Sequence, residues 1–149
     1  MKALRNGMLT IAALALAGSL AGTAKAQANA SGSFTLPFEA KWGNAVLPPG
    51  DYTFSVKSVN AQTEALYLVT FTPKGGSGVT IASLRDLGTG VGEKNMLVAV
   101  RTGGRHRIRS LHLPVANLVV SFAVPKEERT QIARAPQLVE NVPILVARQ

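Results

Sequence analysis

The segment Tyr52-Thr53-Phe54-Ser55-Val56-Lys57 alternates between apolar and polar residues over its whole length. Successive side chains of a β-strand point to opposite faces, so this alternation predicts a strand with one face in a core and the other in solvent. The preceding Leu47-Pro48-Pro49-Gly50-Asp51 places proline and glycine where a type II turn accepts them. The turn and the strand together indicate a β-rich domain.

The same alternation recurs along the chain in short blocks that glycine, proline and asparagine separate. Further strands are expected at 33–42, 65–72, 79–84, 95–101, 105–113, 118–124 and 142–147. The block 65–72 is apolar on both faces, which predicts a central strand buried on both sides. Only residues 126–135, between Pro125 and Pro136, have the pattern of a helix. We therefore expect an all-β fold, a single antiparallel β-sandwich or small barrel of about seven or eight short strands.

Two details of the strands can be predicted more closely. Pro37 has no N–H to donate, so the strand 33–42 should lie at a sheet edge or carry a bulge there. The blocks 95–101 and 105–113 form an expected hairpin around Thr102-Gly103-Gly104. In its second arm Ile108 is out of step with Leu111 and Leu113, so we predict a bulge near Ser110 that brings these three side chains to the core side.

The N-terminus has the three parts of a secretory signal. Lys2 and Arg5 precede an uncharged stretch, 7–24, and Ala24-Lys25-Ala26 has the small residues that signal peptidase requires. We expect residues 1–26 to be a signal peptide, 27–32 a flexible start of the mature chain and 33–149 the β-sandwich domain. The expected location is the periplasm or the outside of the cell. No later apolar run is long enough to cross a membrane as a helix, so the mature chain should have no transmembrane segment.

Charge and cysteine content limit the partners and the source of stability. The whole chain has sixteen Lys and Arg and eight Asp and Glu, and three of the basic residues fall in the expected signal peptide. The mature domain is therefore moderately basic, which favours association with anionic surfaces. The chain contains no cysteine, so the core must stabilise an exported domain without disulfides.

Two blocks carry a family resemblance: Phe34-Thr35-Leu36-Pro37-Phe38-Glu39, and Leu47-Pro48-Pro49-Gly50-Asp51-Tyr52-Thr53-Phe54. They resemble a functionally uncharacterised family of small exported bacterial proteins with an N-terminal PF…LPxGxY motif. The segments 109–113 and 122–126 look like later blocks of such proteins. The resemblance implies export and a β-rich fold, and it brings no catalytic residue.

Basic residues concentrate in the second arm of the expected hairpin. On a regular strand Arg105, Arg107 and Arg109 project from the same side, with guanidinium groups about 7 Å apart. Guanidinium forks bind phosphate and carboxylate bidentately, so these arginines are the candidate anion-binding residues for an anionic envelope component. Two other interpretations stay open. The charges could protect an edge strand from aggregation, or the arginines could pair with Glu127 and Glu128.

The sequence predicts no catalytic, metal or cofactor site. His106 and His112 have no acidic residue near them in the sequence and are expected to face solvent. Trp42, Tyr52 and Tyr67 could form a glycan-binding platform, but alternation groups Trp42 and Tyr52 with core phenylalanines.

We therefore expect a non-enzymatic exported protein that acts by binding or as an assembly component. Its partner would be an anionic envelope component or a protein, and nucleic acid is not expected. The alternatives are a glycan-binding module and a small hydrolase whose site only the fold assembles. The sequence does not determine the oligomeric state.

Overall fold

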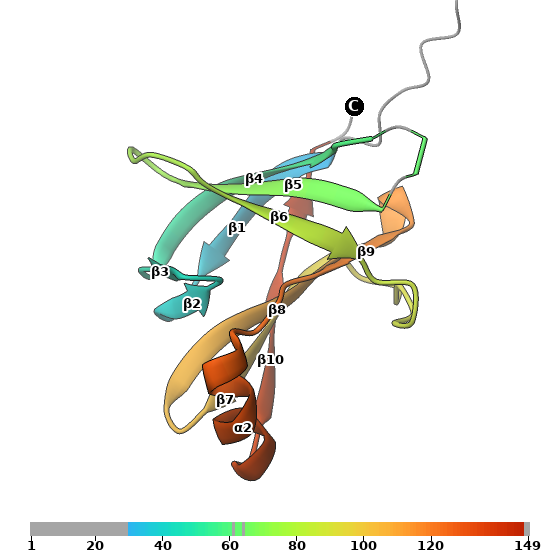
Figure 1. Ribbon diagram of the computed structural model, residues 1–149. Coiled ribbons are helices and arrows are strands. Elements are labelled where there is room, and N and C mark those ends of the chain that lie inside the picture. Colours follow the sequence, from blue (N-terminus) through green and yellow to red (C-terminus); the bar gives the residue numbers. More distant parts are fainter. Residues whose placement is uncertain (1–29, 61, 64, 148–149) are drawn as a thin grey trace, which may run out of the picture.

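The computed structural model describes residues 30–60, 62–63 and 65–147, so the expected signal peptide lies outside the described residues. The prediction of an all-β fold is confirmed, since strands dominate the described chain (Figure 1). The strands are β1 (Ala30–Leu36), β2 (Ala40–Trp42), β3 (Ala45–Leu47), β4 (Gly50–Ser58), β5 (Leu66–Pro73), β6 (Val79–Arg85), β7 (Met96–Thr102), β8 (Arg105–Leu113), β9 (Leu118–Ser121), β10 (Leu138–Pro143) and β11 (Leu145–Val146). A 3-10 turn, η1 (Pro114–Ala116), and one helix, α2 (Lys126–Arg134), complete the described elements.

The strands join in one continuous sheet, in the order β10-β7-β8-β9-β6-β5-β4-β1-β11. Neighbouring strands are antiparallel, apart from the parallel pair of β2 with β8, while β3 pairs with β2. The strand count exceeds the expected seven or eight because two predicted strands are divided and because β3 was not predicted. Residues 33–42 break at Pro37, between β1 and β2, and the C-terminal block begins earlier than expected and splits into β10 and β11. The first strand also begins at Ala30, ahead of the expected domain start at Ser33.

The last described strands lie at opposite ends of the strand order. β10 pairs with β7, whereas β11 pairs with β1. Only Ile144 separates the two strands in the sequence. One C-terminal segment therefore contacts both ends of the sheet and brings its two halves together around the core (Figure 1).

The core lies between the half formed by β1, β4, β5 and β6 and the half formed by β7, β8 and β9. Trp42 is fully buried at its centre, with its ring stacked on Phe71 at a centroid distance of 4.0 Å and edge-on to Phe122 at 5.4 Å. Phe34 and Phe54 are buried as the alternation predicted. The shared interior on which the predicted architecture depends is therefore present.

The turn before β4 explains why Tyr52 follows Pro48 and Gly50 at this spacing. Gly50 has a φ of 151°, a backbone conformation that residues with a side chain rarely adopt. Tyr52, which is buried, donates a hydrogen bond of 2.7 Å from its hydroxyl to the Pro48 carbonyl. The ring fills the core while the hydroxyl holds the turn, so Leu-Pro-x-Gly-x-Tyr acts here as a structural element.

The predicted bulge is confirmed, whereas the prediction for β5 is only half right. The register between β7 and β8 shifts where Val98 pairs with Ser110 and Ala99 pairs with Ile108, which leaves Arg109 as the extra residue. In β5, Tyr67 and Phe71 are buried but Leu68 on the other face is 40% exposed. β5 is central in the strand order, but only one of its faces is covered within the described residues.

The predicted helix is also confirmed as α2. It begins directly after Pro125 and ends before Pro136. Glu127 and Glu128 lie in its first turn and Arg134 in its last, an arrangement that suits the helix dipole.

Candidate anion-binding site

A small pocket lies between β8 and α2. Its volume is about 110 Å³, below the roughly 300–1,000 Å³ of pockets that enclose drug-sized ligands. The charged residues on its walls are Lys41, Arg105, Arg107, Arg109 and Glu128. The pocket therefore contains four basic groups and one acid, and its size suits a single charged group rather than a whole organic molecule.

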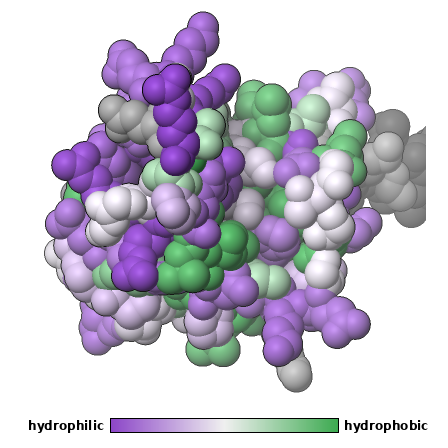
Figure 2. All heavy atoms as spheres, turned by 90° about the horizontal axis from the view of Figure 1, so that it is seen from below, coloured by the Kyte–Doolittle hydropathy of each residue, from purple (hydrophilic) through white to green (hydrophobic). Residues whose placement is uncertain are grey.

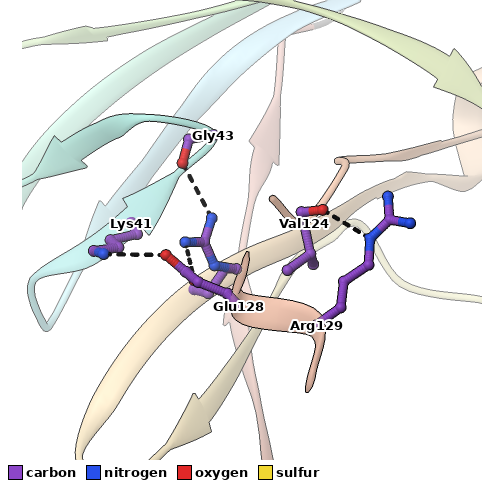
Figure 3. A network of polar contacts seen from close by, with 6 residues as sticks. Lys41, Gly43, Val124, Glu128 and Arg129 are labelled. Atoms are coloured by element: carbon purple, nitrogen blue, oxygen red, sulfur yellow. Dashed lines mark hydrogen bonds and ion pairs between the residues drawn. The ribbon is translucent and has the colours of Figure 1, made fainter. Parts of the chain in front are cut away.

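Arg107 forms the buried base of this pocket. Its side chain is 7% exposed and makes an ion pair with Glu128 through one terminal nitrogen. The other terminal nitrogen donates a 3.1 Å hydrogen bond to the Gly43 carbonyl. Lys41 approaches the second oxygen of Glu128 at 3.2 Å (Figure 3). Arg107 thus ties α2 to β8 and to the turn between β2 and β3.

Glu128 is ionised in this arrangement. Partial burial opposes its ionisation, but hydrogen bonds from Lys41 and Arg107 and the charges of these two residues outweigh that effect and lower its pKa. Arg129, one residue further along α2, donates to the Val124 carbonyl at 3.0 Å (Figure 3). Polar contacts on both sides of α2 therefore fix the helix over the pocket.

The other two arginines of β8 differ from Arg107 in their exposure and in their side-chain partners. Arg105 is exposed and Arg109 is half-buried, and both line the same pocket as Arg107. Within the described chain neither forms an ion pair or a hydrogen bond through its side chain. The structure thus brings together all three predicted arginines, but only Arg105 and Arg109 have guanidinium groups free to bind a ligand.

His106 forms a wall of the pocket. Its ring stacks on Phe38 at a centroid distance of 3.9 Å and an interplanar angle of 9°. Its Nε2 lies 3.3 Å from one carboxylate oxygen of Glu140. The other oxygen of Glu140 lies 3.7 Å from Nε of Arg101. His112 is buried near Ser110, with Nε2 3.0 Å from the serine hydroxyl. The prediction of solvent-facing histidines is therefore wrong, because other strands and loops cover both rings.

The interpretation of the basic strand as a protected sheet edge is also wrong. β8 pairs with β7 on one side and with β2 and β9 on the other. A strand with neighbours on both sides has no free backbone groups to protect. The alternative pairing with acidic residues holds for Arg107 and Glu128, whereas within the described residues no ion pair joins Glu127 to an arginine of β8.

Lys41, Glu128 and the Phe38–His106 stack are parts of the site that sequence reasoning did not assemble. Lys41 comes to the pocket because β2 runs parallel to β8, with Lys41 paired to Arg107. A parallel pairing between strands so far apart in the sequence leaves no local signal. The two glutamates of the expected helix, Glu127 and Glu128, were the one available hint.

The rest of the described chain gives less support for a metal site or for a membrane-spanning helix. Seen from below, the end of the molecule that carries α2 and the β7–β8 turn is mainly hydrophilic, with apolar side chains gathered near its middle (Figure 2). The described residues contain no group of three or more His, Asp or Glu side chains that could hold a metal ion. Among the described helices, none combines the length and apolar character needed to cross a membrane.

Comparison of the chain with protein-family models, with curated proteins and with solved structures found no match.

Proposed function

We propose that this chain is an exported, non-enzymatic protein that binds a phosphate or carboxylate group of an anionic envelope component in the pocket between β8 and α2. The observation that carries the proposal is the pair of unpartnered arginines, Arg105 and Arg109, at a pocket that already has a positive excess. Export is proposed from the signal-like residues 2–26.

The three arginines at the pocket have two different roles, and this arrangement suits anion binding. Arg107 is neutralised by Glu128 and holds the pocket in shape. Arg105 and Arg109 are left to provide the fork-shaped donors that match phosphate and carboxylate oxygens. An anion can therefore bind without breaking the Arg107–Glu128 pair.

The two alternative functions lack comparable support. A glycan platform needs exposed aromatic rings, but Trp42, Tyr52 and Tyr67 are at most 3% exposed. A hydrolase would need a nucleophile and a base in mutual reach. In the described chain Ser110 lies within hydrogen-bonding distance of His112, but His112 is buried and its second ring nitrogen faces the Val91 backbone carbonyl at 3.4 Å rather than an acid.

The test is retention of the mature protein on immobilised lipopolysaccharide and on vesicles of phosphatidylglycerol in phosphatidylcholine, measured against salt. We expect the Arg105→Gln/Arg109→Gln variant to bind about tenfold more weakly, a loss of about 1.4 kcal/mol. The matched control is Lys57→Gln/Lys74→Gln, which removes the same charge from exposed positions outside the pocket. Competition with inorganic phosphate and with acetate distinguishes the two anion chemistries.

The outcome that contradicts the proposal is equal retention of the pocket variant and the control variant. Binding would then follow the net charge of the domain and not the pocket.

A further inference from the structure

The first half of β6 has an unpaired edge. β6 pairs along its whole length with β5 on one side. On the other side it pairs with β9 only at Leu84 and Arg85. Residues Val79 to Ser83 therefore have a strand neighbour on one side alone.

The register shows which backbone groups face that open side. Arg85 donates its N–H to the carbonyl of Ala65, directly before β5, whereas Asp86 donates to the Val119 carbonyl of β9. Hydrogen-bonding direction alternates along an antiparallel strand, so odd-numbered residues of β6 bond to β5 and even-numbered residues point the other way. Thr80 and Ala82 thus direct their backbone N–H and C=O groups away from β5, towards the open edge of the sheet. Both residues are exposed.

The ladder between β6 and β9 ends because the chain after β9 is held elsewhere. Phe122 donates its N–H to the Arg109 carbonyl of β8. Pro125, which the register would place opposite Thr80, has no N–H, and the chain turns there into α2. The separation leaves a groove of about 730 Å³ between residues 79–82 and 122–125, with the β2–β3 turn as a further wall.

The groove is uncharged throughout its lining. Val79 and Ile81 are only partly buried and pack against the core from the groove side. The segment Val79-Thr80-Ile81-Ala82-Ser83 has no lysine, no proline and no bulge, the usual features that prevent an edge strand from pairing. This edge thus combines free hydrogen-bonding groups with an apolar floor.

We propose that an extended, uncharged segment of another polypeptide binds in this groove as an added strand on β6. The occupant must be extended because Thr80 and Ala82 offer alternating donors and acceptors at strand spacing. Its side chains must be uncharged because the lining offers no group to pair with a charge. Walls on both sides, from residues 43–45 and 123–125, admit a single chain rather than the edge of a second folded sheet. This site is separate from the anion pocket and independent of the proposed function.

The experiment uses a fluorescent peptide of alternating threonine and valine with blocked ends, titrated into the protein and followed by fluorescence anisotropy. The test variant is Ala82→Pro, which removes an outward N–H and leaves the bonds to β5 in place. The matched control is Ala82→Thr, which keeps the N–H and suits a strand. We expect saturable binding by the wild type and the control, and at least about tenfold weaker binding by Ala82→Pro.

Two further measurements keep the proposal testable if Ala82→Pro fails to fold. A fully N-methylated form of the peptide should not bind the wild type, because it lacks the donors of a strand. Amide exchange of Thr80 and Ala82 in the wild type should slow when the unmodified peptide is added.

Three results would overturn the proposal. They are equal binding of the peptide by Ala82→Pro and Ala82→Thr, binding of the N-methylated peptide, and a wild-type dimer that Ala82→Pro dissociates without any peptide. The last result would assign the edge to a second copy of this chain.

Discussion

β6 and β8 differ in both charge and strand pairing. β8 carries three arginines and two histidines but has strand neighbours on both sides. β6 has no charged residue before Arg85, and its first half has a free edge. The charges of β8 are thus not needed to prevent edge-to-edge pairing, and the strand that lacks such protection is β6.

The difference separates two kinds of surface on one sheet. Where a strand has two neighbours, the ladder satisfies its backbone, and only side chains remain to recognise a ligand, as the arginines do at the anion pocket. Where a strand has one neighbour, the backbone itself is available, as at Thr80 and Ala82. The predictions that follow test this separation.

The largest expected effect is the difference in stability between proline substitutions at two adjacent positions of β6, Ser83 and Ala82. Ser83→Pro removes an N–H that bonds to β5, and it also removes the hydroxyl that donates to the Ser121 carbonyl. We expect a loss of roughly 3 kcal/mol in the free energy of unfolding, measured by urea denaturation. Ala82→Pro, whose N–H faces the groove, should lose less than about 1 kcal/mol. Equal losses would show that the outward direction assigned to Ala82 is wrong.

A smaller effect is expected in β8, where Arg107 and Arg105 should differ sharply. Arg107→Met keeps most of the side-chain volume but leaves Glu128 without its buried partner and the Gly43 carbonyl without its donor. Its expected cost is about 2 kcal/mol of unfolding free energy. Arg105→Met, at an exposed position without an ion pair in the described chain, should change stability by less than about 0.5 kcal/mol. Similar values for the two variants would contradict the division between a structural arginine and a ligand-binding arginine.

The smallest effect concerns pH and the closed end of β6. Hydrogen bonds from Ser121 and Thr89 and from the backbone of Thr89 and Gly88 lower the pKa of Asp86 from 3.8 to about 2. Because the folded state has the lower pKa, this stabilisation is present above about pH 4 and is lost as the pH falls towards 2.

For this partly exposed carboxylate we expect about 1 kcal/mol after allowing for screening by solvent. Asp86→Asn should therefore remove that much of the stability difference between pH 5 and pH 2, measured by urea denaturation at each pH. An unchanged difference in the variant would mean that Asp86 does not hold this end of β6 to β9.

Local patterns in the sequence were sufficient to predict most strands and their buried faces. The alternation of Tyr52, Phe54 and Val56 depends only on the pleat of a strand, and the bulge in β8 follows from the mismatch between Ile108 and Leu111. The exposure of Leu68 was missed because an apolar side chain on a sheet surface has the same sequence signal as a buried one.

The two proposed sites were less accessible to sequence reasoning. The arginines could be named because their spacing is local, but Lys41 and Glu128 reach the pocket through long-range pairing and packing. The free edge of β6 depends on where the chain after Ser121 leaves the sheet. No residue of Val79 to Ser83 carries that information.

The position of β10 and β11 has a consequence for how this chain is made. β1 leads the described part of the sheet, yet one of its two neighbours, β11, is synthesised more than a hundred residues later. β7 likewise gains its second neighbour only when β10 emerges. Contacts so distant in sequence slow folding, and here the described sheet stays incomplete until β10 and β11 have been synthesised. A nascent chain with this topology therefore stays open, with β1 and β7 each lacking one strand neighbour, until the segment with β10 and β11 has been synthesised.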